Sequence, residues 1–260
     1  MIKNQNDWNP ETYARFRGFR LRPALDLLAQ FPNLPAGDIV DLGCGNGAVG
    51  PALKARFPER RLVGIDSSPA MLDRAKSAMC YDDLQQDDAN TWSPDRPPAL
   101  IFSNALCHWL PDHDTLFPRL VHALATGGTL AVQMPRQYDA PSHALLREIA
   151  QQMFPDMFDF SNWQAPVLDA LSYARMLDGL GQASVWETEY VQRLAAVDAG
   201  HPVRHFTMST AMRPFVEKLT EPQSDAFTKG YEAALDAAYP KLENGDVFFP
   251  FRRVFFVISL

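Results

Sequence analysis

Cysteines and long apolar runs are scarce in this chain of 260 residues. Its three cysteines are odd in number, lack CxxC spacing and do not form the dense framework of a small secreted domain. No apolar run approaches the roughly 20 residues of a membrane helix, and the first residues include no apolar stretch of signal-peptide length. We therefore expect a cytoplasmic protein with reduced cysteines and no membrane partner.

Clusters of positive charge and of metal ligands are also lacking. The chain has 24 Lys and Arg residues against 31 Asp and Glu residues, for a net charge of −7, and it contains no basic stripe. Because phosphate neutralisation supplies most of the affinity for nucleic acids, this balance argues against a nucleic-acid partner. His108 and His113 are five residues apart and have no Cys or Glu at ligand spacing, so we expect no metal, and we expect His113 to lie in a solvated loop.

The composition nevertheless supports a substantial core. Hydrophobic residues make up 47% of the chain and charged residues 21%, which is far from the composition of a disordered protein. A domain of this length buries roughly 70 to 75% of the surface of its unfolded chain. Because the sequence contains no internal repeat and no low-complexity linker, we expect one domain spanning 1–260, and we expect it to be a monomer.

Short apolar runs alternate with Gly or Asp turns and helical stretches between residues 37 and 133. This alternation is typical of βαβ units, which form a parallel sheet with helices on both faces. It predicts strands at 38–42, 61–66, 81–85, 99–103 and 129–134. Further along, the pattern predicts helices at 141–152, at 166–179 and within 202–239, and strands at 184–194 and 247–258. The fold class is therefore α/β, with a doubly wound and mostly parallel sheet.

A glycine-rich turn, DLGCGNG at 41–47, joins the first predicted strand to the next helix. Its glycines permit a tight turn and the close approach of a ligand to the backbone. The spacing is GxGxG and not the GxGxxG of dinucleotide-binding turns, and no GxxxxGK[ST] phosphate loop is present. An acid before the first glycine would repel a pyrophosphate but suits a ligand with an ammonium group. Asp41, Gly43, Gly45 and Gly47 are therefore candidate ligand-binding residues.

Polar residues also follow the next three strands. Asp66 closes the second strand, where a carboxylate can accept hydrogen bonds from both hydroxyls of a ribose. Asp88 follows the third strand and can accept from an adenine amino group, and Asn104 follows the fourth, beside the expected crevice. Any one of these acids can instead cap a helix or close a turn. Taken together with the glycine turn, they suggest a nucleoside that carries an amino acid, namely S-adenosylmethionine.

These motifs resemble those of the class I S-adenosylmethionine-dependent methyltransferases. The resemblance is closest to the members that methylate aconitate-like acids, and it recurs along the chain at 8–13, 20–23, 109–113, 131–135, 141–143, 186–188, 213–214 and 250–253. It implies a seven-stranded sheet, S-adenosyl-L-methionine as cofactor, and methyl transfer to one carboxylate of a small polycarboxylic acid. The implied cofactor-binding residues are Asp41, Gly43, Asp66, Asp88, Ala89 and Asn104, and we add Gly45, Gly47 and Ser67 from the same turns.

The chain divides accordingly into four segments. We expect an N-terminal helical lid at 1–34, a cofactor-binding core at 35–135, and a helical substrate cap at 136–245 that contains one core strand at about 184–194. The final strand occupies 246–260.

Cationic and aromatic residues outside the core are the candidates for binding the acceptor. A guanidinium group binds a carboxylate through two parallel hydrogen bonds, which suits a diacid or triacid. Arg252 and Arg253 are neighbours in the last predicted strand and face opposite ways, so at most one of them points into a given pocket. The predicted substrate-binding residues are Tyr13, Arg20, Trp109, Arg213, Arg252 and Arg253.

His108 follows the fourth strand, where a turn of this fold faces the transferred methyl group. An acceptor carboxylate has a pKa of roughly 4 and needs no base, so a neutral His108 would only hydrogen-bond a substrate oxygen. The sequence departs from the aconitate enzymes at His108, Gln192 and Met208, which leaves the acceptor open. One alternative is methylation of a hydroxyl, amine or carbon with His108 as base. In different classes, the alternatives are a nucleotide-binding dehydrogenase and a protein that holds the cofactor without catalysis.

Overall fold

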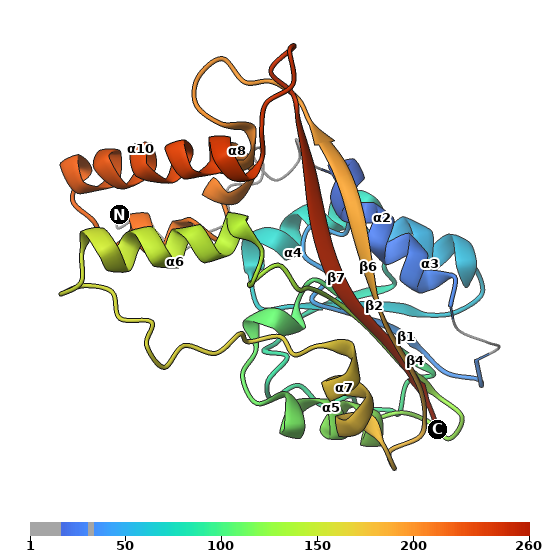
Figure 1. The fold of residues 1–260 in the computed structure, drawn as a ribbon. Coiled ribbons are helices and arrows are strands. Elements are labelled where there is room, and N and C mark those ends of the chain that lie inside the picture. Colours follow the sequence, from blue (N-terminus) through green and yellow to red (C-terminus); the bar gives the residue numbers. More distant parts are fainter. Residues whose placement is uncertain (1–16, 31–33) are drawn as a thin grey trace, which may run out of the picture.

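A seven-stranded sheet forms the centre of the computed structural model, which describes residues 17–30 and 34–260 (Figure 1). The strand order is β3-β2-β1-β4-β5-β7-β6. The strands are β1 (Ile39–Leu42), β2 (Leu62–Asp66), β3 (Asp83–Gln86), β4 (Leu100–Asn104), β5 (Thr129–Pro135), β6 (Gln182–Leu194) and β7 (Val247–Ser259). The first five strands pair in parallel, whereas β7 is antiparallel to both β5 and β6. The predicted doubly wound, mostly parallel sheet is confirmed.

Helices cover both faces of this sheet, as the alternation of side chains along its strands requires. On one face α2 (Arg17–Leu28) and α3 (Gly50–Arg56) share a hydrophobic cluster with Ile39 of β1 and Phe255 of β7. On the other face α5 (His113–His122) and α7 (Ala170–Leu177) pack with the next residues of the same strands, Val40 and Phe256. Because successive strand residues point to opposite faces, the continuous apolar runs of the sequence supply both layers.

A third group of helices forms a cap beside one end of the sheet. It comprises α6 (Pro141–Met153), α8 (Pro202–Met208), α9 (Arg213–Val216) and α10 (Glu221–Ala238), which lie to the left in Figure 1. Strands β6 and β7 pair over 247–259 of β7, but β5 reaches only 253–259. The part of β7 that extends past β5 carries Phe249 and Phe251, which are buried among the cap helices. The cap is therefore anchored on strands of the sheet itself.

The N-terminal segment is only partly described. Ala24 and Leu27 of α2 are buried against the sheet, so this helix packs on the core. Residues 1–16 and 31–33 of the expected lid lie outside the described residues, and the division of the chain into lid, core and cap stays a prediction. No helix within 17–30 and 34–260 is long and apolar enough to cross a membrane.

The expectation that His113 is solvated is wrong. This residue begins α5 and is buried, with its Nδ1 atom 2.7 Å from the hydroxyl of Tyr173 and its Nε2 atom 2.9 Å from the carbonyl oxygen of Cys107. The short helix η2 (Cys107–Trp109), α5 and α7 are thereby tied together. His113 is buried because Phe117, one turn along α5, and Tyr173 pack their rings against it.

Candidate active site

Two adjoining cavities lie at the carboxyl ends of the parallel strands. The first, of about 380 Å³, is lined by the turns that follow β1, β2, β3 and β4. The second, of about 350 Å³, lies between η2, the segment after β5 and the cap. Both are lined by Asn104, Ala105 and Trp109. Since the strand order reverses between β1 and β4, the first cavity occupies the switch point at which ligands of such sheets bind.

The glycine turn places backbone directly against the first cavity. Gly43, Gly45 and Gly47 have φ angles of 77°, 55° and 78°, in the region that favours glycine. A Cβ atom on Gly45 would meet nothing within 4 Å, so the space beside this residue is open to a ligand. Gly43 and Gly45 line the cavity, but Gly47 does not. A Cβ atom on Gly47 would instead come within 3.1 Å of Ala75, so this glycine allows the turn to pack closely on α4 (Pro69–Ala75).

Two carboxylates of the lining are held in place by hydrogen bonds. Asp41 is buried and its Oδ2 atom accepts a hydrogen bond of 2.6 Å from the hydroxyl of Tyr81. Burial raises the pKa of Asp41 to about 7, although the bond from Tyr81 opposes this rise. Asp66 accepts from the backbone N–H groups of Gly45 and Ser68, at 2.8 Å and 2.9 Å. Each oxygen of Asp66 retains a lone pair, so this carboxylate can still accept hydrogen bonds from a ligand.

The remaining predicted cofactor residues complete the same cavity. Ser67, Asp88, Ala89 and Asn104 all line it. Asp88 is exposed and holds its own turn, since its Oδ1 atom accepts from the backbone and side-chain nitrogens of Asn90. The Oδ1 atom of Asn104 is buried and has no hydrogen-bond partner in the described part of the chain. Because buried polar atoms are normally satisfied, this oxygen marks a position for a donor from a ligand.

The turn that separates the two cavities is held in an unusual conformation. Ala105 has a φ angle of 56°, which is uncommon for a residue with a side chain. Its backbone N–H donates to the carbonyl oxygen of Gln133 in β5, at 2.9 Å, and this bond fixes the turn. The chain leaves β4 in a direction that brings η2 over both cavities, with Trp109 lining each of them.

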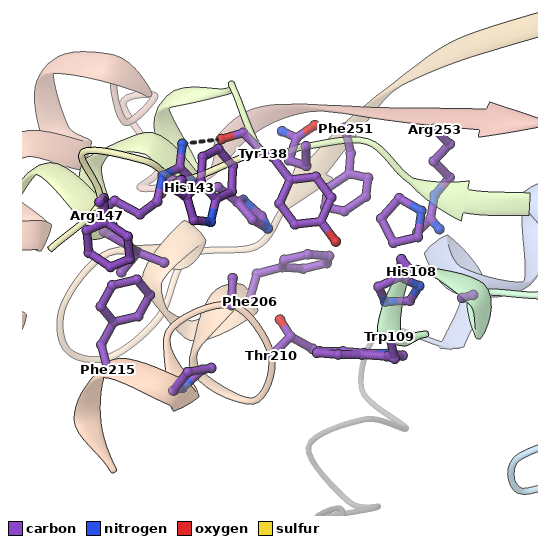
Figure 2. A pocket seen from close by; sticks show the side chains of 18 of the residues that line it. His108, Trp109, Tyr138, His143, Arg147, Phe206, Thr210, Phe215, Phe251 and Arg253 are labelled. Atoms are coloured by element: carbon purple, nitrogen blue, oxygen red, sulfur yellow. Dashed lines mark hydrogen bonds between the residues drawn. The ribbon is translucent and has the colours of Figure 1, made fainter. Parts of the chain in front are cut away.

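The second cavity has a polar end beside this turn (Figure 2). His108 and Arg253 approach each other there, and the hydroxyl of Tyr138 also points inward. Burial, together with the charge of Arg253, lowers the pKa of His108 to about 3, so its ring is neutral at physiological pH. Arg253 is itself buried, and its Nη1 atom donates to Oε1 of Gln133 at 3.3 Å. This end therefore presents a neutral imidazole and a guanidinium group.

The rest of the second cavity is mainly apolar and includes a cation that the sequence analysis did not identify. Phe206, Phe215 and Phe251 line it, and Arg147 of α6 lines it on the side away from Arg253 (Figure 2). In the sequence, the signal for this role was the position of Arg147 in a helix, directly after Leu146, which is buried. That signal is weak, since a lone Arg on a helix is usually a surface residue with a buried stem.

The structure does not bring every predicted substrate-binding residue to this cavity. Arg253 and Trp109 line it, but Arg252 is exposed on the opposite face of β7 and pairs with Glu189, at 3.6 Å, and with Glu187. This division follows from the alternation of side chains along a strand. Arg213 lines neither cavity and pairs with Glu217 one turn along the chain, at 2.6 Å.

Of four other residues named from the sequence, two cannot be placed and two lie outside both cavities. Tyr13 is outside the described residues. Arg20 belongs to α2, and its side chain is likewise outside what the structure describes. Gln192 and Met208 line neither cavity. Of the three departures from the aconitate pattern, only His108 therefore reaches the site.

Comparisons with known proteins identify the family. A model of the methyltransferase domain matches residues 13–183. The chain is 40% identical over 251 residues to the trans-aconitate 2-methyltransferase of Azoarcus sp. strain BH72, covering 96% of this chain and 98% of that protein. It belongs to the class I S-adenosylmethionine-dependent methyltransferases. The trans-aconitate 2-methyltransferase of Escherichia coli K12 is 38% identical over 254 residues, covering 97% and 98% of the two chains. The predicted family, enzyme class and cofactor are confirmed.

Solved structures share the fold of this methyltransferase at low sequence identity. The YcgJ protein of Bacillus subtilis matches with a TM-score of 0.52 and 14% identity, over 95% of this chain and 98% of that one. A protein described as a methyltransferase from Bacillus halodurans C-125 matches with a TM-score of 0.54 and 13% identity, over 93% of this chain and 99% of that one. At these identities the similarity establishes the shared architecture alone.

Proposed function

We propose that this methyltransferase transfers the methyl group of S-adenosylmethionine to one carboxylate of trans-aconitate, or of a closely similar polycarboxylic acid, and so forms a methyl ester. The full-length similarity to enzymes named for trans-aconitate supports this proposal. The structural observation that carries it is the buried guanidinium of Arg253, which lines a cavity that adjoins the cofactor cavity. A small anionic acceptor is the ligand that such a cation suits.

The first cavity has the lining that S-adenosylmethionine requires. In the proposed arrangement Asp41 faces the ammonium group, Asp66 accepts from the ribose hydroxyls, and Asp88 with Ala89 flanks the adenine. Ser67, Gly43 and Gly45 complete the surface, and the unpartnered amide oxygen of Asn104 accepts from the ligand. When bound, the cofactor supplies an electrophilic methyl group on a sulfonium centre. The four carboxylates of the lining, those of Asp41, Asp66, Asp87 and Asp88, also match the positive charges of this cofactor.

The second cavity would hold the acceptor and exclude water. A carboxylate is already ionised at neutral pH, so the protein does not need to remove a proton from it. Arg253 donates to carboxylate oxygens and thereby orients the acid, while His108 hydrogen-bonds as a neutral ring. The aromatic lining keeps water away from the transferred group. Alignment of two reactants in this manner contributes roughly 7 to 11 kcal/mol in well-oriented systems.

Methylation of a hydroxyl, amine or carbon with His108 as base is the second candidate. A general base works best when its pKa lies near the working pH. The pKa of about 3 at His108 makes this imidazole a weak base, so the site favours an acceptor that is already ionised.

The experiment that tests the proposal is methylation with a donor labelled on the methyl group. Purified protein is incubated with trans-aconitate and, in parallel, with cis-aconitate, citrate, isocitrate, and uncharged alcohols and amines. We expect label in a product that mild base hydrolyses to methanol, as a methyl ester requires. Base-stable label would support the second candidate, and no label from any of the carboxylic acids would refute the proposal. We further propose a cytoplasmic monomer, which light scattering after size-exclusion chromatography tests for its oligomeric state.

A further inference from the structure

Arg147 is a cationic residue of the second cavity to which the proposed function gives no role. It belongs to α6 of the cap, and in Figure 2 it lies on the side of the cavity opposite to Arg253 and His108. The cavity thus has a guanidinium at each side, with Phe206 and Phe251 between them. An acceptor bound at Arg253 would extend toward Arg147.

The guanidinium of Arg147 is held in a fixed position by contacts with neutral groups. Its Nη2 atom donates to the carbonyl oxygen of Tyr138 at 2.8 Å, and Nη1 donates to that of His143 at 3.3 Å. The guanidinium carbon lies 3.7 Å from the centre of the Trp163 ring, within the range of a cation–π interaction. An arginine has five N–H donors, so these contacts leave donors available to a ligand.

No carboxylate neutralises this cation in the described part of the chain. The ion pairs formed within 17–30 and 34–260 do not include Arg147. Burial lowers its pKa by more than the surface carboxylates of Asp139 and Glu148 raise it. Arg204 of α8 is equally half-buried in the same cap, but its Nε atom pairs with Glu232 at 2.7 Å. Because a half-buried cation that only neutral groups contact is less stable than one paired with an anion, an anionic ligand would stabilise Arg147.

We propose that Arg147 binds a second carboxylate of the acceptor, the one that lies farthest from the transferred methyl group. This inference rests on the proposed function and specifies which acids the site selects. Acids that carry a carboxylate able to reach Arg147 bind well, and acids that lack it bind poorly. In trans-aconitate, one carboxylate faces the methyl donor and another pairs with Arg147, while the hydrocarbon part contacts Phe206 and Phe251.

The test compares Arg147→Met with the wild type on a set of matched acids. Trans-aconitate is a tricarboxylate, and itaconate, mesaconate and glutaconate each lack a different one of its three carboxylates. Binding is measured by calorimetry with protein saturated with S-adenosylhomocysteine. We expect Arg147→Met to weaken binding of trans-aconitate about 10- to 100-fold, the effect of losing hydrogen bonds to a charged group. For one of the three diacids, the one without the carboxylate that pairs with Arg147, we expect no change.

Two further variants serve as controls. Arg147→Lys keeps the charge but not the fork of donors, so its affinity for trans-aconitate should lie between those of the wild type and Arg147→Met. Arg175→Met removes an exposed arginine of α7 that lines neither cavity, and all affinities should stay as in the wild type. Thermal unfolding checks that each variant folds. If Arg147→Met does not fold, Arg147→Lys with the three diacids decides the question in the same way.

The inference and the proposed function fail in different ways. If the wild type forms no methyl ester, the proposed function is lost, whatever Arg147 does. If the wild type forms the ester but Arg147→Met binds trans-aconitate as the wild type does, Arg147 binds no carboxylate. An equal loss for trans-aconitate and all three diacids would likewise overturn the inference, because it would show that Arg147 only supports the shape of the cavity.

Discussion

The hydroxyl of Tyr81 donates a hydrogen bond of 2.6 Å to the carboxylate of Asp41. Asp41 is in β1, whereas Tyr81 lies two residues before the start of β3, and β2 lies between these two strands in the sheet. The bond therefore crosses a neighbouring strand and ends on the acid that begins the glycine turn. Because it favours the ionised form, it opposes the effect of burial on the pKa of Asp41.

Replacement of Tyr81 by Phe should weaken cofactor binding at neutral pH. Without the hydroxyl, the pKa of Asp41 rises further above 7 and less of the carboxylate is ionised to meet the ammonium group. Loss of a hydrogen bond to a charged group corresponds to roughly one to two pKa units, so we expect affinity to fall about 5- to 50-fold at pH 7. Calorimetric titration with S-adenosylhomocysteine measures this change.

A matched control for this variant is Tyr190→Phe. It also removes a hydroxyl that donates to a carboxylate, that of Asp26 at 2.7 Å, but Tyr190 lines neither cavity. Cofactor affinity should not change in this control. Affinity in Tyr81→Phe should recover at pH 9, and a loss that persists there would mean that Tyr81 acts through packing and not through ionisation.

The raised pKa of Asp41 also predicts two pH dependences of opposite sign. Cofactor binding requires the ionised acid, so affinity should increase with pH up to about 7 and then level off. In the protein without cofactor, the folded state holds this proton more tightly than the unfolded chain does. The contribution of Asp41 to stability should therefore fall as the pH rises from about 4 to about 7.

Asp41→Asn removes the titrating group and should flatten both dependences. Affinity is followed by calorimetry and stability by chemical denaturation across the same pH range. Unchanged pH profiles in Asp41→Asn would assign the titration to another residue.

His108 should not behave as a general base. With its pKa lowered to about 3, the ring stays neutral throughout the physiological range, so turnover at saturating cofactor and acceptor should be flat from pH 6 to 8. His108→Gln keeps a hydrogen-bonding side chain and should retain activity within about 10-fold, because loss of a general base typically costs 100-fold or more. A turnover rate that rises through the ordinary histidine range, and vanishes in His108→Gln, would restore the second candidate function.

The cofactor site could be predicted from the sequence because it depends on local patterns and on one topological rule. Asp66 and Asn104 end their strands and Asp41 is the last residue but one of β1, and parallel strands bring their carboxyl ends to one edge. Continuous apolar runs and flanking glycines located the strands themselves. Tyr81 was not identified, because nothing around it in the sequence indicates that its hydroxyl reaches across β2 to Asp41.

The acceptor site was less predictable because it is assembled from segments far apart in the chain. The alternation of side chains along a strand shows that Arg252 and Arg253 face opposite ways. Which of the two faces the cavity is decided by the pairing of β7 with β5 and β6 and by the placement of the cap. Arg147 enters the cavity only because α6 packs against α10 and β7. Long-range packing of this kind leaves no short motif in the sequence.

Arg253 and Arg252 therefore form a natural pair for the last prediction. Arg253→Met removes a buried guanidinium from the cavity lining, whereas Arg252→Met removes an exposed one that pairs with Glu187 and Glu189 on the other face. We expect kcat/KM for trans-aconitate to fall about 10- to 100-fold in Arg253→Met, since hydrogen bonds to the acceptor carboxylate are lost. Arg252→Met should keep its activity and lose at most about 1 kcal/mol of stability, as exposed ion pairs contribute little.

The division of this loss between KM and kcat shows what Arg253 does. If it binds the acceptor equally in the ground state and in the transition state, KM rises and kcat is kept. If it instead aligns one carboxylate with the methyl group, kcat falls as well, because misplacement of a reactant raises the barrier itself. Binding of S-adenosylhomocysteine should be unchanged in both variants, since neither arginine lines the first cavity. Equal activity in Arg253→Met and Arg252→Met would remove Arg253 from the acceptor site and with it the observation on which the proposed function rests.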